Sequence, residues 1–380
     1  MPTTRQLSVN LICYMKSIIL SIICTSFMLP AQNLLAQRLI IGTYTNNNAS
    51  KGIYVYDFNA VNGEAREISS AKAGNPSYQV VDNKRDFVYS VNESDEGKIS
   101  AFKYNRSTGS LSLVNQQSNN GSAPCYVSID KTGKWLFAGN YSSGNLTVHP
   151  IASDGSIGII QQVIQHRGSG PNKGRQESAH VHCTYVSPDN RFLYVPDLGI
   201  DKVMIYPFNA QTGRLDTAQS SAITIPAGGG PRHIVFTQNG KSGYIIEELS
   251  GAITVVVRKG NQHSIVQQIN NLPAPYNGAS ADVHLSPDER FLYTSHRGNS
   301  TLQIHKVDAK TGRLSFVAEQ STNGNFPRNF TIHPSGKWLL AANQKSNDIT
   351  IFKRDTQTGL LTDTQQRISV PAPVCLQWID

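Results

Sequence analysis

The chain has 380 residues, of which 39% are hydrophobic and 16% are charged, a composition typical of a globular protein and unlike that of a disordered one. Its 30 glycines and 18 prolines favour turns between strands over long helices. The net charge of +8 is mild, and no segment carries a run of lysine and arginine, so the sequence argues against a nucleic-acid partner.

The first 36 residues have the layout of a secretory signal peptide. Lys16 is followed by an apolar run over residues 18–29 and then by a polar stretch that ends at Ala36. A retained membrane anchor is the alternative, but about 12 apolar residues are too few for a spanning helix, which needs roughly 20. We therefore predict a signal peptide over residues 1–36 and export to the periplasm or the medium, with no stable membrane insertion after cleavage.

Three cysteines remain beyond the predicted cleavage site, namely Cys125, Cys183 and Cys375. An odd number without metal-type spacing predicts neither a disulfide framework nor a zinc site.

The rest of the chain repeats one phrase six times: an extended run, a polar turn, a large residue and a second extended run. The residues after the turn are Phe87, Trp135, Phe192, Ser242, Phe291 and Trp338, which are separated by 48, 57, 50, 49 and 47 residues. A period near 50 in a pattern of strands is typical of a β-propeller blade.

A second hairpin follows each phrase and also occurs once before the first phrase, so there are seven second hairpins. Two hairpins make a four-stranded antiparallel blade. Residues 38–44 supply only one strand of a first hairpin, and we expect residues 374–379 to pair with them. The sequence thus predicts one all-β domain over residues 37–380, a seven-bladed propeller whose N- and C-terminal strands close the ring and remove exposed sheet edges.

The longest spacing contains an insertion over residues 165–183, which is polar, rich in glycine and without alternation. Functional loops on rigid scaffolds have this character, although a loop that merely grew longer would look the same.

Some polar residues interrupt the repeat next to the strands expected to line the ring's axis. Asp197 is interpreted as a turn cap, Asn140 and Asn343 as structural, and His284 and His333 as satisfied core or turn histidines. The residues that packing explains least are His180, His182, Arg232 and Glu248, because charge inside a shared channel must be paired or used.

Several stretches together resemble one family, the lactonase family of seven-bladed propellers, which includes propeller-type 6-phosphogluconolactonases and the carboxy-cis,cis-muconate cyclase. The resemblance covers about residues 38–379 and is carried by IIGTYT, SVNE, GNYSSGNLTV, HVH with PDLGIDKV, GPRHIVF, SHRGNSTL and FPRNFTIHPSGKWLL.

The resemblance implies a histidine, an arginine and a glutamate as catalytic residues. The arginine falls on Arg232, the glutamate on Glu248 rather than Glu247, and the histidine on His182, with His180 as the other candidate in HVH. Expected substrate contacts are His180, Arg297, Arg328 and Glu93.

These residue types suit the opening of a lactone by water. Arginine can hold the acyl oxygen, and a neutral histidine or a carboxylate can take a proton from water. We expect no cofactor and no metal, although His180 and His182 would make a metal site if a third ligand existed. We expect a monomer that binds a small, anionic, sugar-derived lactone. A phosphorylated sugar lactone belongs to cytoplasmic metabolism, which conflicts with the predicted export. A non-catalytic binding propeller and a lactone-forming cyclase are the alternatives.

Overall fold

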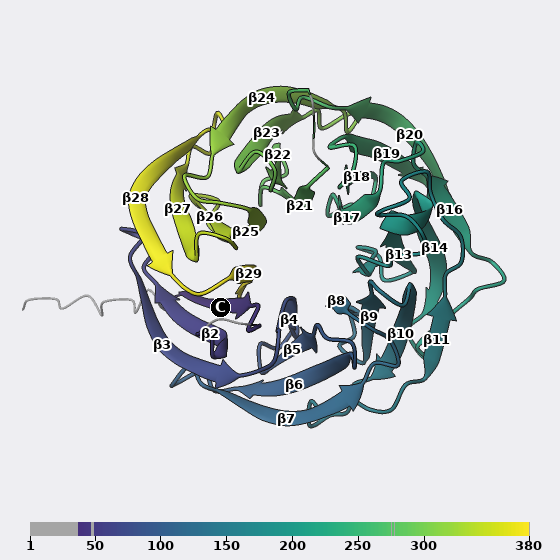
Figure 1. The fold of residues 1–380 in the computed structure, drawn as a ribbon, viewed down its shortest axis with the longest axis horizontal. Coiled ribbons are helices and arrows are strands. Elements are labelled where there is room, and N and C mark those ends of the chain that lie inside the picture. The colour runs from purple at the N-terminus through teal and green to yellow at the C-terminus, as the bar shows by residue number, and fades with distance from the viewer. Residues whose placement is uncertain (1–36, 47–48, 275, 277, 380) are drawn as a thin grey trace, which may run out of the picture. The chain divides into compact units, whose positions relative to one another are not determined.

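The computed structural model describes residues 37–46, 49–274, 276 and 278–379. The predicted signal peptide, residues 1–36, lies outside the described residues. Residues 36–380 form one compact unit. Seven antiparallel sheets follow one another around a ring, which confirms the predicted all-β, seven-bladed propeller (Figure 1).

The first four blades contain the following strands in the described residues. The first has β1 (Gln37–Thr43), β2 (Gly52–Phe58), β3 (Ala65–Lys72) and β29 (Pro373–Trp378). The second has β4 (Gln79–Val81), β5 (Phe87–Asn92), β6 (Lys98–Tyr104) and β7 (Leu111–Ser118). The third has β8 (Pro124–Ile129), β9 (Trp135–Asn140), β10 (Asn145–Pro150) and β11 (Gln162–Gln165). The fourth has β12 (Tyr185–Val186), β13 (Phe192–Asp197), β14 (Lys202–Asn209), β15 (Arg214–Leu215) and β16 (Ser221–Thr224), with the short 3-10 helix η1 (Leu198–Ile200) after β13.

The last three blades contain four strands each. The fifth has β17 (Pro231–Phe236), β18 (Ser242–Glu247), β19 (Ile253–Lys259) and β20 (Gln262–Ile269). The sixth has β21 (Ser280–Leu285), β22 (Phe291–His296), β23 (Thr301–Val307) and β24 (Leu314–Ser321). The seventh has β25 (Pro327–Ile332), β26 (Trp338–Asn343), β27 (Asp348–Arg354) and β28 (Leu361–Ser369).

The two ends of the ring join as predicted. The C-terminal strand β29 pairs antiparallel with β1, with Leu39 opposite Trp378 and Ile41 opposite Leu376. The innermost strand of the first blade therefore comes from the end of the chain, and the ring has no unpaired edge at its seam.

Apolar faces of neighbouring blades pack against each other to form the core. At the seam, for example, one buried cluster contains Leu39, Trp338, Ile351 and Leu376. A fully buried side chain of this size stabilises the fold by about 1.5–3 kcal/mol relative to leaving it exposed.

The repeated large residue has a specific packing partner in the neighbouring blade. Gly213, in the Thr-Gly turn after β14, has a φ of 72°, and a Cβ there would lie 2.3 Å from the Trp135 ring. Only glycine combines this left-handed conformation with such a close approach. The equivalent turn in the first blade, Asn62-Gly63, brings Gly63 against the Trp338 ring. The large residue of the repeat therefore packs against the glycine of this turn in the neighbouring blade.

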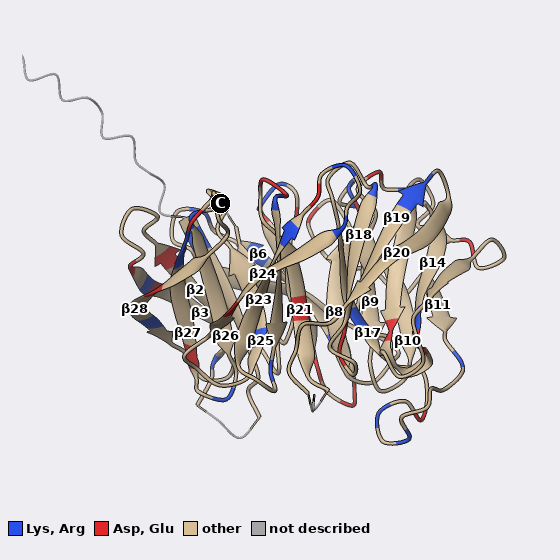
Figure 2. Cartoon of the chain, turned by 90° about the horizontal axis from the view of Figure 1, so that it is seen from above, with Lys and Arg blue, Asp and Glu red and all other residues tan. Residues whose placement is uncertain are grey.

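Figure 2 shows the ring from the side, with basic and acidic residues interspersed along both of its edges and strands that are mostly neutral between them. No helix in the described part of the chain is long and apolar enough to cross a bilayer.

Candidate active site

Several of the innermost strands contain a β-bulge close to their first residue. In four of them the register shifts immediately after a proline, at Pro124-Cys125, Pro231-Arg232, Pro327-Arg328 and Pro373-Val374. Proline has no backbone N–H to lose from the ladder, and a bulge turns its extra residue away from the regular alternation. The recurring Pro-x pair therefore places one side chain per blade at the axis of the ring.

These bulge residues line a small pocket. Its walls are formed by Ser77, Tyr78, Cys125, Arg232, His233, Arg328, Asn329 and Val374. They come from five of the seven sheets, whose inner strands surround the centre of the ring in Figure 1. Side chains that lie up to about 300 residues apart in sequence thus meet at one point, which is a property of ring closure.

Arg232 and Glu248 lie side by side at one end of the β17–β18 hairpin. Pro231 pairs with Glu247 at the open end of the β17–β18 hairpin. The next residue of each strand is part of the site, and Arg232 Nε lies 2.9 Å from Glu248 Oε2. The two side chains are 2% and 4% exposed, so the ion pair is shielded from solvent.

Glu248 contacts two further guanidinium groups. Arg297, which follows β22, places Nη2 2.8 Å from the same Oε2, whereas Arg175 places Nη2 2.5 Å from Oε1. Burial raises the pKa of Glu248, but the charges of Arg297, Arg232 and Arg175 outweigh it and lower the pKa to about 2. The carboxylate is therefore ionised at neutral pH and holds three arginines in place.

The sequence predicted the loop over residues 165–183, but only His180 and His182 within it as site residues, and gave no indication of Arg175. The loop joins β11 to β12 and is fixed by its neighbour Gln176, which is fully buried. Gln176 Nε2 donates to the Leu198 carbonyl at 2.9 Å and to Asp201 Oδ1 at 2.7 Å. A loop without alternation gives no indication of which side chain points inward, so only the structure identifies Arg175.

The two histidines of HVH have different environments. The His182 ring is buried, and its Nδ1 has no hydrogen-bond partner among the described residues. Burial and the positive charges of Arg232 and Arg328 hold the pKa of His182 well below its usual value, so the ring is neutral. His180 instead directs Nδ1 to the Tyr141 carbonyl at 2.9 Å and stacks on the Tyr141 ring at 4.4 Å.

A buried His-Asp pair supports Arg232 from behind. His233 Nε2 lies 3.2 Å from Arg232 Nη1, and His233 Nδ1 lies 2.8 Å from Asp282 Oδ1. Because the guanidinium can only donate, Nε2 accepts and Nδ1–H donates to Asp282. Burial and Arg232 lower the pKa of His233 to about 4 despite the carboxylate, which keeps the ring neutral. The other carboxylate oxygen, Asp282 Oδ2, lies 2.9 Å from His284 Nε2.

The sequence predicted no role for His233 or Asp282. His284, interpreted as a satisfied core or turn histidine, is indeed satisfied, by Asp282. The spacing of the repeat did not indicate that Asp282 is the hydrogen-bond partner of His284.

Glu93 and Arg328 are connected through Tyr44. The Tyr44 hydroxyl donates to the Glu93 carboxylate, with distances of 3.1 and 3.0 Å to its two oxygens, and the Arg328 guanidinium lies 5.4 Å from the Tyr44 ring centroid. Arg328 has no ion-pair partner within the described residues. Burial lowers the pKa of Arg328, but Tyr44, Glu93 and Glu248 raise it by a larger amount. The net pKa is above its usual value, so the guanidinium stays charged beside the pocket.

The predicted site residues therefore gather around one axial pocket: His182, Arg232, Glu248, Arg297 and Arg328 as an arginine-rich group, with His180 and Glu93 at its sides. In the part of the chain that the structure describes, no three His, Cys, Asp or Glu side chains are grouped as a metal site requires.

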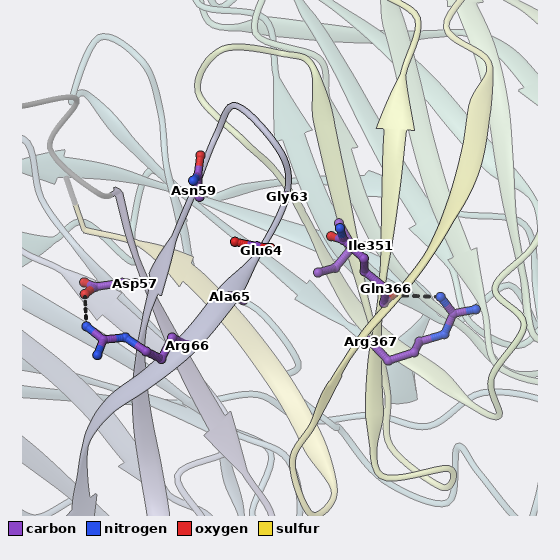
Figure 3. A pocket seen from close by; sticks show the side chains of 9 residues that line it. All are labelled: Asp57, Asn59, Gly63, Glu64, Ala65, Arg66, Ile351, Gln366 and Arg367. Atoms are coloured by element: carbon purple, nitrogen blue, oxygen red, sulfur yellow. Dashed lines mark hydrogen bonds and ion pairs between the residues drawn. The ribbon is translucent and has the colours of Figure 1, made fainter.

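A wider groove of about 620 Å³ lies elsewhere, between the β2–β3 hairpin and strands β27 and β28. Figure 3 shows Asp57 paired with Arg66 on one wall and Arg367 bonded to Gln366 on the other. Arg367, on the opposite wall, lies 2.7 Å from Asp363. Because both arginines of this groove already have carboxylate partners, the groove offers less positive charge to a ligand than the small axial pocket.

The sequence matches the family described as lactonase, seven-bladed β-propeller, over residues 38–378. It is 37% identical to the 6-phosphogluconolactonase of Formosa agariphila over 354 residues, which cover 89% of this chain and 98% of that protein. The crystal structure of a candidate 6-phosphogluconolactonase from Bacteroides fragilis superposes with a TM-score of 0.86 at 39% identity, covering 90% of this chain and 98% of that one. The periplasmic gluconolactonase of Pseudomonas aeruginosa has the same TM-score of 0.86 at 33% identity, covering 90% and 99%.

Proposed function

The chain belongs to the lactonase family of seven-bladed β-propellers, and we propose that it is a lactone hydrolase that opens a sugar-derived lactone at the axial pocket. The observation that carries the proposal is that two arginines, Arg232 and Arg328, line the same pocket. Close to them lies a neutral histidine, His182, whose Nδ1 has no hydrogen-bond partner among the described residues. An acyl transfer to water needs these two things, positive charge for the oxygen and a base for the water.

His182 is the general base in this mechanism. Its Nδ1 takes a proton from water as the water oxygen bonds to the acyl carbon, and Arg232 with Arg328 holds the negative charge that develops on the carbonyl oxygen. The bond between the acyl carbon and the ring oxygen then breaks. The proton returns from His182 to the departing oxygen, and the product is an open-chain hydroxy acid. Positioned arginines in a site shielded from water stabilise such an oxyanion strongly.

Glu248 acts by holding the arginines rather than by taking a proton. Both of its carboxylate oxygens are occupied by guanidinium groups, Oε1 by that of Arg175 and Oε2 by those of Arg232 and Arg297, whereas His182 Nδ1 has no partner among the described residues. The contacts of Glu248 with Arg232 and Arg297 keep two buried guanidiniums charged and oriented. Arg297, Glu93 and His180 are proposed to contact the substrate, with Glu93 accepting hydrogen bonds from sugar hydroxyls. An excess of positive charge at the pocket favours an anionic lactone.

The experiment is a hydrolysis assay with purified protein on glucono-δ-lactone and its 6-phosphate, with Arg232→Ala, Glu248→Gln and a matched neighbour, Glu247→Gln. Glu247 is equally buried, but its carboxylate accepts from neutral donors, Thr254 Oγ1 and Ser250 Oγ at 2.6 Å and Gln268 Nε2 at 2.9 Å. We expect Glu248→Gln to lower kcat/KM by about 100-fold or more, since one lost electrostatic contact of this kind has that effect. The Glu247→Gln protein should stay within about threefold of wild type once its folding has been checked.

Equal activity of the two glutamate variants would show that Glu248 has no role in the reaction. Binding of a lactone without turnover by the wild-type protein would instead identify a non-catalytic binding propeller.

We also propose that the protein is exported. The proposal rests on the pattern of residues 1–36, and the similar gluconolactonase of Pseudomonas aeruginosa is described as periplasmic. Cell fractionation followed by N-terminal sequencing tests it. A mature protein that begins near residue 37 in the periplasm or medium supports export, whereas a cytoplasmic protein that keeps residues 18–29 contradicts it.

A further inference from the structure

We infer that Arg175 is a specificity-determining residue: its guanidinium leaves Glu248 to bind an anionic group that the substrate carries outside its lactone ring. The inference rests on the proposed lactone hydrolysis and adds the residue that distinguishes a phosphorylated sugar lactone from a neutral one.

The first observation is that the three arginines on Glu248 are not equivalent. The Arg232 and Arg297 side chains are 2% and 8% exposed and share Oε2, whereas the Arg175 side chain is 38% exposed and alone contacts Oε1. A guanidinium that faces solvent on one side can accept a new anionic partner without first being uncovered. Arg175 is therefore the one of the three that an incoming anion reaches.

The second observation concerns what holds each arginine. Arg232 Nη1 also donates to the Ala281 carbonyl at 2.5 Å, and Arg297 donates to the carbonyls of Ala279 at 3.1 Å and Ser280 at 3.2 Å. These bonds to backbone fix both groups. Arg175 Nη2 instead bonds side chains, Glu248 and, at 3.4 Å, the Tyr141 hydroxyl, so its guanidinium can move with the rotamers of its own long side chain.

The third observation is that the backbone beneath Arg175 is fixed, whereas its guanidinium is held by side chains alone. Gln176 anchors the next residue to Asp201, and the same Asp201 accepts from the N–H groups of Gly228 and Gly230 at 2.8 Å, just before Arg232. The insertion is thereby locked to the segment that carries the proposed oxyanion arginine. This places a partly exposed cation at a defined position beside the site.

The charge balance makes the exchange feasible. When Arg175 turns to a substrate anion, Glu248 still has two guanidinium partners, so no buried carboxylate is left unpaired. A neutral lactone offers no anion, and Arg175 then stays on Oε1. The residue should therefore affect substrates with a second anionic group and leave neutral ones largely unaffected.

The test measures kcat/KM for glucono-δ-lactone 6-phosphate and for glucono-δ-lactone in wild-type protein and in Arg175→Ala. We expect the ratio of the two values to fall roughly 10- to 100-fold, the loss that corresponds to one charge-assisted hydrogen bond. Arg175→Lys should recover part of the preference because the charge remains. The matched control is Lys173→Ala, which removes one exposed cation two residues earlier in the same loop and should leave the ratio nearly unchanged.

Calorimetry with 6-phosphogluconate and gluconate, the open-chain acids, gives a second readout that needs no turnover. Weaker binding of the phosphorylated acid alone in Arg175→Ala supports the inference. An equal fall for both substrates and both acids, or an equal effect of Lys173→Ala, overturns it. A wild-type protein that hydrolyses neither lactone but binds 6-phosphogluconate through Arg175 refutes the proposed hydrolysis and keeps the specificity; one that binds neither acid refutes both.

Discussion

His182 is the side chain whose environment departs most from a structural role. A buried ring nitrogen without a partner is unfavourable by about 1–3 kcal/mol. Among the described residues, His182 Nδ1 shares this feature with His305 Nδ1 and His333 Nε2, but His182 lies close to the charges of Arg232 and Arg328. His180, two residues earlier, is engaged at both nitrogens, by the Tyr141 carbonyl and, at 3.2 Å, by Glu177. The contrast favours His182 as the base and His180 as a wall of the site.

Replacing His182 with glutamine tests this assignment. The amide has no lone pair basic enough to take a proton from water, so kcat for lactone opening should fall by about 10²- to 10⁴-fold. Stability should change little, because the Nδ1 of the wild-type ring makes no bond that the variant would lose. Assays beside His305→Gln, a buried histidine on β23, provide the control. Comparable kcat values in the two variants would contradict the role of His182.

Asp282 acts on Arg232 through His233, as a positioning residue. Its carboxylate fixes the tautomer of His233, whose Nε2 then accepts from Arg232. In Asp282→Asn the amide can donate to Nδ1 and reverse the tautomer, so that Nε2–H points at the guanidinium. We expect kcat to fall about 10- to 100-fold, as for the loss of a hydrogen bond to a charged group, with little change in KM.

The control for Asp282→Asn is His284→Gln, which removes a partner of Asp282 and leaves the His233 contact intact. A smaller effect in this variant is expected. Identical kcat values for the two proteins, or a change in KM alone, would show that Asp282 serves only the fold.

At the scale of elements, the hairpin explains why part of the site was predictable. Antiparallel pairing brings the two ends of β17 and β18 together, so Arg232 and Glu248 could be placed side by side from their spacing. The bulges could not be recognised in the same way, because Pro-Arg at the start of a run also fits a regular strand. Its recurrence as Pro124-Cys125, Pro327-Arg328 and Pro373-Val374 was the available signal.

Arg175 and the His233–Asp282 pair lay beyond sequence reasoning for a physical reason. The first depends on the path of an irregular loop, and the second on a contact between two neighbouring blades, β17 and β21, 49 residues apart. Period and alternation describe each blade by itself. They contain no information about which rotamers meet between blades.

The seam of the ring depends on one element, β29. Leu376 is buried in the cluster that joins the first and last blades. We expect Leu376→Ala to lower the free energy of unfolding by about 2–5 kcal/mol, as in other buried leucine truncations. Leu360→Ala, at a leucine that is 45% exposed in the turn before β28, should stay within about 0.5 kcal/mol. Urea unfolding measures both, and equal midpoints would mean that the seam contributes little to stability.

At the scale of the whole molecule, the blades bury several neutral histidines. Burial lowers the pKa of His305 to about 4 and that of His296 to about 3. Burial and Arg232 lower that of His233 to about 4. In the unfolded chain each has a pKa near 6.5. Between about pH 6.5 and 4 the unfolded state therefore binds protons that the folded state does not, and stability must fall as the pH is lowered.

Each such histidine contributes a slope of at most about 1.4 kcal/mol per pH unit. His284, whose pKa is raised by Asp282 against the effect of burial, opposes the trend but is a single group. We therefore expect the urea midpoint to be steady above about pH 7 and to drop steeply from about pH 6.5 to 4.5. His305→Gln removes one buried titrating ring on β23, away from the axial pocket, and should make the slope shallower. A midpoint that does not change over this range, or a slope that His305→Gln leaves unaltered, would mean that these rings are protonated in the folded protein.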